Sequence, residues 1–88
     1  MPKIKAEKSF SHKSSKLIKN NPDLKEKILK ATKLLRQNPF DQSLKTHALS
    51  GQLKGKYACF LTNDMRIIFK IGDNVIHILD IGTHDEVY

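Results

Sequence analysis

Three short apolar runs follow one another closely in the second half of the chain, at residues 57–61, 65–71 and 75–81. The breaks between them are Thr-Asn-Asp at 62–64 and Gly-Asp-Asn at 72–74, residue types that favour tight turns. Short apolar runs separated by such breaks are typical of antiparallel strands. We therefore predict a three-stranded antiparallel meander.

Side chains in the second and third runs alternate between two faces, because successive residues of a strand point in opposite directions. One face of the second run is apolar, and the other holds Arg66, Ile68 and Lys70; in the third run, Val75, His77, Leu79 and Ile81 alternate with Ile76, Ile78 and Asp80. The apolar face is expected to meet the helices. An arginine on the less apolar face is better explained by binding an anion than by packing, and a salt bridge from Arg66 to Asp80 or another acid is the alternative.

The first half of the chain has a helical pattern instead. Leu24, Ile28, Ala31 and Leu35 recur at spacings of four, three and four, which predicts one stripe of an amphipathic helix. Leu29 and Leu34 are expected to widen this stripe. Asn21 is a suitable N-cap with Pro22 at the first helical position, and Asn38-Pro39 ends the helix because the residue before proline is pushed out of the α region.

The remaining segments complete the predicted order of elements. Residues 3–7 are expected to form a short strand with Ile4 and Ala6 inward, followed by a helix capped by Ser9 or Ser11 that runs to about Asn20 and packs through Phe10, Leu17 and Ile18. Residues 40–55 form a long connection whose three leucines hold it against the domain, so that it presents His47. The prediction is an α+β fold of order βααβββ, with an antiparallel sheet packed against two helices.

Length and composition restrict the class of protein. Eighty-eight residues are expected to form one domain spanning 1–88, and no apolar run is long enough to span a bilayer or to act as a signal peptide. We therefore expect a cytoplasmic protein with no membrane association. The single cysteine, Cys59, excludes an internal disulfide and a multi-cysteine zinc site, and its position in a strand predicts an inert, buried thiol. No spacing of His, Cys and Asp has the character of a metal site, so we predict no metal and no cofactor.

The formal net charge of +7 is distributed unevenly. Residues 1–36 hold eleven Lys and Arg against three acids, whereas residues 37–88 hold five against six. A basic half on so small a chain favours a polyanionic partner, because neutralising phosphates releases their counterions. A solvated, lysine-rich helix surface explains the charge alone equally well.

Three motifs in the second half together resemble a known family. They are HxLxGxLxG from His47, DxRIIFK from Asp64 and IGTHDEVY from Ile81. In this order and spacing they resemble the RelE-type toxins of bacterial toxin–antitoxin pairs, and most closely the YafQ-like ribonucleases. The predicted βααβββ order matches that family as well, so the resemblance covers most of the chain.

This resemblance implies a metal-independent endoribonuclease that cuts messenger RNA on the ribosome. It also implies a small antitoxin that wraps the toxin and blocks its site. In that chemistry the ribose 2′-OH attacks the adjacent phosphorus and leaves a 2′,3′-cyclic phosphate and a free 5′-OH. Such a reaction needs a base, an acid for the leaving oxygen, and positive charge for the phosphorane.

The resemblance also suggests roles for single residues. His84 is expected to be the general acid; Asp64 is the better candidate for the base or orients a histidine; His47 is a second candidate base or a phosphate contact. Arg66 is expected to stabilise the developing charge. Substrate binding is assigned to Tyr88, as an aromatic that stacks on a base, and to Lys54, Lys56 and Phe60.

Phe60 is also a departure from the family, because YafQ-like proteins often carry a further histidine there. That shifts the choice of base to His47 and Asp64, and it leaves Phe60 as either a stacking residue or an ordinary core residue. The other two histidines are poor site candidates: His12 lies among lysines and is expected in solvent, and His77 alternates with apolar residues.

Two other functions stay open on the sequence. Related ParE-type proteins have a similar fold but poison DNA gyrase, and fold alone does not separate the two activities. A plain RNA-binding module would use only the lysine-rich helices, which are also candidates for docking on ribosomal RNA. The set His47, Asp64, Arg66 and His84 favours the ribonuclease, because neither alternative has a use for it.

Overall fold

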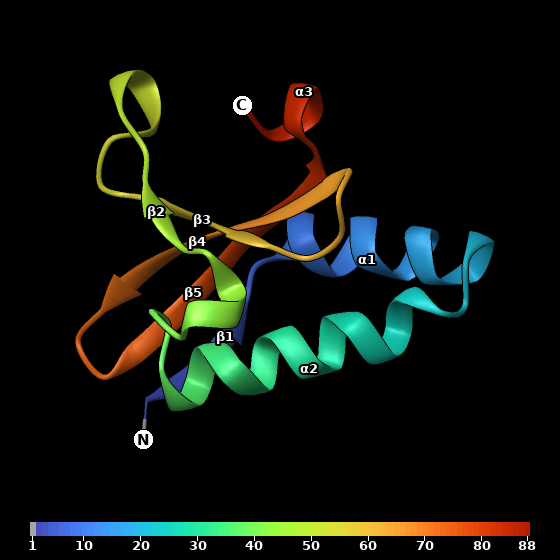
Figure 1. Ribbon diagram of the computed structural model, residues 1–88, viewed down its shortest axis with the longest axis horizontal. Coiled ribbons are helices and arrows are strands. Elements are labelled where there is room, and N and C mark those ends of the chain that lie inside the picture. Colours follow the sequence, from blue (N-terminus) through green and yellow to red (C-terminus); the bar gives the residue numbers. More distant parts are fainter. Residues whose placement is uncertain (1) are drawn as a thin grey trace.

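The computed structural model describes residues 2–88 (Figure 1). Its strands are β1 (Lys3–Ala6), β2 (His47–Ala48), β3 (Tyr57–Phe60), β4 (Met65–Gly72) and β5 (Val75–Thr83). Its helices are α1 (Lys8–Asn20), α2 (Leu24–Gln37) and α3 (His84–Val87), with two single 3₁₀ turns, η1 (Gln42–Leu44) and η2 (Gly51–Leu53). None of the helices in residues 2–88 has the length and apolar character needed to cross a membrane.

The sheet has the order β1-β5-β4-β3-β2. The predicted meander is confirmed as β3, β4 and β5, which pair in antiparallel fashion. The first strand is also confirmed, and it pairs parallel to β5. The predicted α+β fold is therefore correct, and the structure adds a second edge: His47 and Ala48 form the short strand β2 against β3. His47 thus stands on a strand and not in an irregular loop.

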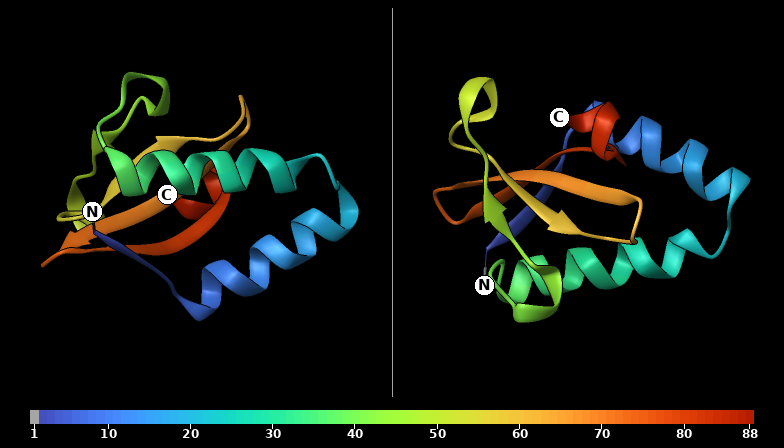
Figure 2. Two further views of the ribbon diagram at one scale, coloured as in Figure 1. Left: turned by 90° about the horizontal axis from the view of Figure 1, so that it is seen from below. Right: turned by 45° about the horizontal axis from the view of Figure 1, so that its top comes forward.

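Both long helices cover one face of the sheet (Figure 2). The predicted stripe of α2 is confirmed, because each of its four residues is at most 6% exposed. They pack with Phe10 of α1 and with the inward-facing isoleucines and phenylalanine of the central strands. Leu34 joins this core partly, but Leu29 is 58% exposed and the prediction for it was wrong.

A bulge in β5 overturns the strict alternation predicted for that strand. Ile68 of β4 pairs with Asp80 and the next residue, Phe69, pairs with Ile78, so Leu79 has no partner. The extra residue reverses the alternation, as bulges do. Ile76, Ile78 and Ile81 consequently all enter the helix-covered core, while Leu79 packs on the other face.

The ends of the elements differ from the prediction in small ways. α1 begins at Lys8 after Glu7, and α2 begins at Leu24 after Asp23, with no capping bond from a side chain in either case. At the second helix it is the carbonyl of Asn21 that accepts from Leu24 N–H, at 3.0 Å. Ala6 is exposed, so only Ile4 of β1 points inward. Helix ends depend on local turn geometry, which the apolar pattern does not encode.

Candidate active site on the open face of the sheet

The face of the sheet that the helices leave uncovered carries most of the candidate residues. In Figure 1, α3 and the hairpin between β2 and β3 both project from this face and flank it. Val87 of α3 packs on Ala58 and Ile68, at the centre of the sheet, in a second small apolar cluster. This contact fixes α3 over the strands and so holds the side chains that α3 carries beside the open face.

Phe60 and Arg66 form the floor of the site. They occupy opposite positions on β3 and β4, and the Arg66 guanidinium carbon lies 5.1 Å from the centre of the Phe60 ring. The Lys45 ammonium lies at the same distance from that ring. A cation over an aromatic face is attracted by the ring quadrupole. Phe60 therefore gathers two positive charges, and it is only partly buried, unlike an ordinary core phenylalanine.

Arg66 keeps its charge available for an anion. Its Nη1 donates to backbone carbonyls, to Thr62 O at 2.6 Å and Met65 O at 2.9 Å, and within residues 2–88 no carboxylate lies within ion-pairing distance of it. The alternative of a bridge to Asp80 does not form, because Asp80 Oδ1 pairs with Lys13 Nζ at 2.8 Å instead. Lys45 was missed by the sequence interpretation. Its position two residues before His47 was the only available signal.

Tyr88 connects the two candidate histidines. Its hydroxyl lies 3.4 Å from His47 Nε2, and its ring meets the His84 ring edge to face, with centres 4.2 Å apart. Burial raises the pKa of the Tyr88 hydroxyl, and the charge of Arg66 acts in the opposite direction. Tyr88, the C-cap of α3, therefore brings His47 of β2 and His84 of α3 together, and Arg66 of β4 lies near enough for its charge to act on the Tyr88 hydroxyl.

The contacts of His47 favour one tautomer of its neutral ring. His47 Nδ1 lies 3.4 Å from the carbonyl oxygen of Lys45, which can only accept a hydrogen bond. With its proton on Nδ1, a neutral His47 donates to this carbonyl, and the lone pair of Nε2 then faces the Tyr88 hydroxyl. An imidazole in this state can take a proton from a hydroxyl group.

The single turn of α3 is held in place by local contacts. Thr83 N donates to Glu86 Oε1 at 2.8 Å within a capping box, which satisfies a free N–H of the first turn and lowers the pKa of the Glu86 carboxyl. The backbone of Gly82, just before the turn, lies close to the side chains of α3, because a Cβ at this position would lie 3.2 Å from atoms of Glu86 and Val87. His84 itself is exposed, with Nδ1 3.7 Å from Asp85 Oδ1.

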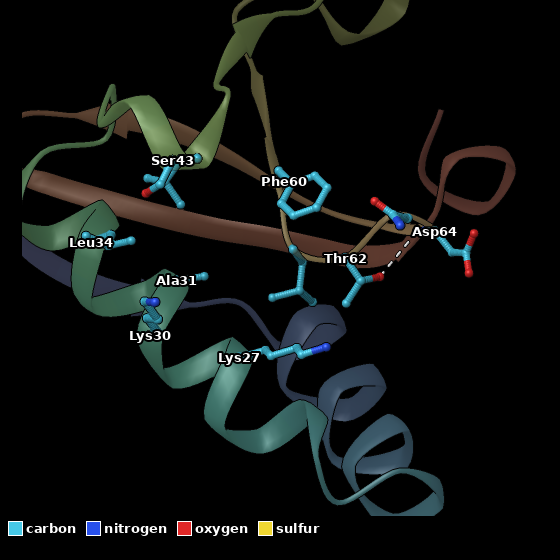
Figure 3. A pocket seen from close by; sticks show the side chains of 11 residues that line it. Lys27, Lys30, Ala31, Leu34, Ser43, Phe60, Thr62 and Asp64 are labelled. Atoms are coloured by element: carbon cyan, nitrogen blue, oxygen red, sulfur yellow. Dashed lines mark hydrogen bonds between the residues drawn. The ribbon is translucent and has the colours of Figure 1, made fainter.

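Asp64 lies apart from the histidines. It stands in the β3–β4 turn, where its N–H donates to Thr62 Oγ1 at 3.3 Å. Its carboxylate is exposed and makes no hydrogen bond or ion pair with residues 2–88. It lines a groove between the turn and α2 (Figure 3). Lys54 and Lys56 lie on the β2–β3 hairpin, where Lys54 is exposed and Lys56 is partly buried.

The remaining titratable candidates are outside the site. His12 is exposed on α1, and His77 is half-buried with Nδ1 3.5 Å from Glu7 Oε1. Cys59 is fully buried, and burial raises the pKa of its thiol to about 12, which confirms the prediction of a buried thiol and makes it a poor nucleophile. Over residues 2–88, no three His, Cys, Asp or Glu side chains gather in a way that could hold a metal ion.

A family model and several solved structures match this chain over nearly its whole length. Residues 2–88 match the family model described as the bacterial toxin YafQ of type II toxin–antitoxin systems. Among solved structures, a metal-bound toxin from Helicobacter pylori is 30% identical with a TM-score of 0.84, and each chain covers 100% of the other. The YafQ toxin of E. coli is 24% identical with a TM-score of 0.83, covering 100% of this chain and 99% of its own.

A third solved structure is a complex of E. coli YafQ with DinJ. The matching chain is 24% identical to the present one, with a TM-score of 0.81 and coverage of 100% and 99%. These two E. coli structures share the fold of this chain. No curated protein sequence matches it.

Proposed function

This chain belongs to the YafQ family of bacterial toxins of type II toxin–antitoxin systems, and from that membership we propose that it is a ribosome-dependent, metal-independent endoribonuclease that cleaves messenger RNA. The observation that carries the proposal is the arrangement of the open face. Two histidines are linked through Tyr88 beside a floor on which Arg66 and Lys45 offer unpaired positive charge. A gyrase poison has no need of such a set.

The first step is activation of the ribose 2′-hydroxyl. His47 is the better placed base, because its Nε2 lies 3.4 Å from the Tyr88 hydroxyl on the open face while its Nδ1 lies 3.4 Å from the Lys45 carbonyl, which can only accept a proton. The 2′-oxygen then attacks the adjacent phosphorus as its proton passes to Nε2. Asp64, the other candidate base, has no contact with a histidine, and its position beside α2 supports a role in binding more than in proton transfer.

The second step is departure of the 5′-oxygen. Protonated His84, exposed on α3 at the edge of the site, donates its proton to this oxygen as the bond to phosphorus breaks. Arg66 and Lys45 neutralise the charge that develops on the phosphorane, and the guanidinium fork suits two phosphate oxygens at once. The products are a 2′,3′-cyclic phosphate and a free 5′-hydroxyl.

Two macromolecular partners follow from this proposal. One E. coli YafQ structure is a complex with DinJ. We propose that a cognate antitoxin likewise binds the present chain and blocks its open face. The exposed lysines of α1 would contact ribosomal RNA, since residues 1–36 carry eleven of the sixteen Lys and Arg residues. Such binding weakens steeply with salt because it depends on counterion release.

The test is messenger RNA cleavage in a translation extract, with the new 5′ ends mapped. Wild-type protein is expected to cut at defined codon positions. His84→Ala is expected to lower the rate by roughly 100- to 10,000-fold, the usual contribution of a general acid. His12→Ala is the matched control, because it removes an exposed histidine from α1, and it is expected to cut like the wild type.

Two results would contradict the proposal. Growth arrest on expression without any RNA cleavage would favour the gyrase-directed or another non-enzymatic activity. Undiminished cleavage by a folded His84→Ala protein would keep the ribonuclease but remove His84 from its chemistry. Circular dichroism of each variant separates loss of activity from loss of fold.

A further inference from the structure

A groove lies between α2 and the turn that joins β3 to β4. Its volume is about 560 Å³, within the range of sites that hold small molecules. In Figure 3, Lys27 and Lys30 rise from α2 on one side, and Phe60, Thr62 and Asp64 lie on the other. Nothing in the catalytic arrangement described above uses the two lysines.

The groove borders the candidate active site, because Phe60 and Thr62 line it and both contact Arg66. Phe60 lines the groove, and the same ring carries the Lys45 and Arg66 cations. A ligand that extends past Phe60 from the open face therefore enters the groove. Positive charge is present at both ends of that path, with Arg66 and Lys45 at one end and Lys27 and Lys30 at the other.

The rim and the floor of the groove differ, and together they favour an anionic ligand that carries a flat apolar group. The floor is apolar and is formed by buried Ala31, Leu44 and Leu61 with half-buried Leu34 and Phe60. The exposed lining side chains are charged or polar, namely Lys27, Lys30, Ser43, Asn63 and Asp64. Lysines beside amide, hydroxyl and carboxylate groups suit a phosphate chain that carries bases with hydrogen-bonding edges.

We propose that this groove is a subsite for single-stranded RNA and holds a nucleotide adjacent to the scissile phosphate. Lys27 and Lys30 contact its phosphates on the α2 side. The base lies on the side of the turn, against Phe60 and beside Asn63, because the Asp64 carboxylate repels phosphate there and accepts from base amino groups. The inference rests on the proposed RNA substrate and adds a binding position to it.

The test compares two double variants with the same change of charge on the same helix. Lys27→Ala/Lys30→Ala removes the groove lysines, and Lys25→Ala/Lys33→Ala removes two exposed lysines of α2 that do not line the groove. Binding of a 2′-O-methyl oligoribonucleotide, which lacks the attacking hydroxyl, is measured over a range of salt concentrations. Backbone amide shifts of the wild-type protein are followed by NMR in the same titration.

The groove variant is expected to bind at least several-fold more weakly. The slope of log affinity against log salt is expected to become shallower by roughly 1.4, at about 0.7 for each lost phosphate contact with a single strand. The Lys25/Lys33 control is expected to keep the wild-type slope. Amide shifts are expected at Asn63 and Asp64 and along the Lys27–Leu34 segment of α2.

Several outcomes would overturn the inference. Equal weakening in both double variants would mean that only overall charge matters. Unchanged RNA affinity with lost antitoxin binding would assign the groove to the protein partner. If the proposed function itself is wrong, the wild-type protein cuts no messenger RNA. If only the inference is wrong, the groove variant still cleaves messenger RNA and binds RNA like the wild type.

Discussion

At the scale of single residues, the open face assigns different surroundings to groups that look alike in the sequence. His47 and Asp64 both matched the family's candidates for the base, yet only His47 contacts Tyr88 and thereby the other histidine. Motif spacing predicted that these residues belong to one half of the chain. It did not predict which would meet, because the direction of a turn side chain depends on tertiary packing.

The choice of base gives a prediction at this scale. His47→Ala is expected to lower single-turnover cleavage by roughly 100-fold or more, because the 2′-hydroxyl loses its proton acceptor. Asp64→Asn, which removes a carboxylate without changing its size, is expected to cause a smaller loss. Cleavage rates of the two variants on the same message, measured across the neutral pH range, decide between them. A larger loss in Asp64→Asn would make the carboxylate the base.

At the scale of elements, α3 shows how a very short helix can be held firmly enough to carry a site. One turn has too few internal hydrogen bonds to be stable alone. Three contacts supply the stabilisation that the turn itself lacks. They are the capping box of Thr83 and Glu86, the close packing of Gly82 against the turn and the burial of Val87. In the sequence, the terminal segment is recognisable as a motif and not as a helix, because four residues show no helical period.

Removal of this cap is expected to loosen α3 without unfolding the sheet. The Glu86 carboxyl has a pKa below its ordinary value of 4.5. Its carboxylate therefore stabilises α3 fully above pH 4.5, and this stabilisation is lost as the pH falls through the lowered folded-state pKa. Glu86→Ala is expected to lose this contribution at all pH values. The Tyr88 amide, which bonds to His84 O at 3.0 Å, reports it through hydrogen exchange.

The control for this experiment is Glu26→Ala, which removes an exposed carboxylate from α2. It is expected to leave the protection of the Tyr88 amide unchanged. Equal protection in Glu86→Ala and wild type would mean that Val87 alone anchors the turn. Cleavage is expected to fall with the protection of this amide, because α3 carries His84 and its C-cap is Tyr88.

At the scale of the whole molecule, the apolar period predicted the layers well. The α2 stripe and the β3–β5 meander are where the pattern placed them, because burial selects apolar residues at regular spacing. The bulge at Leu79, the edge strand at His47 and the groove beside Lys27 were not predicted. Each depends on how two segments distant in sequence meet, and a single chain carries no periodic signal for such contacts.

The stability of these layers can be tested on two leucines of one helix. Leu35 is 0% exposed and Leu29 is 58% exposed, so the same substitution acts on a core and a surface position. Leu35→Ala is expected to lower the free energy of unfolding by about 2–5 kcal/mol and Leu29→Ala by less than about 0.5 kcal/mol. Urea denaturation followed by circular dichroism measures both. Similar losses in the two variants would contradict the packing of α2 described above.

The position of β5 in the sheet has a consequence for synthesis. This strand follows all the others in sequence, yet it lies between β1 and β4 and pairs with both. During synthesis, both long helices leave the ribosome before β5, the strand that completes the sheet on which they pack. A product that terminates before Val75 lacks this central strand, His84 and Tyr88 together. Termination before Val75 therefore removes the strand that completes the sheet and part of the candidate site in one step.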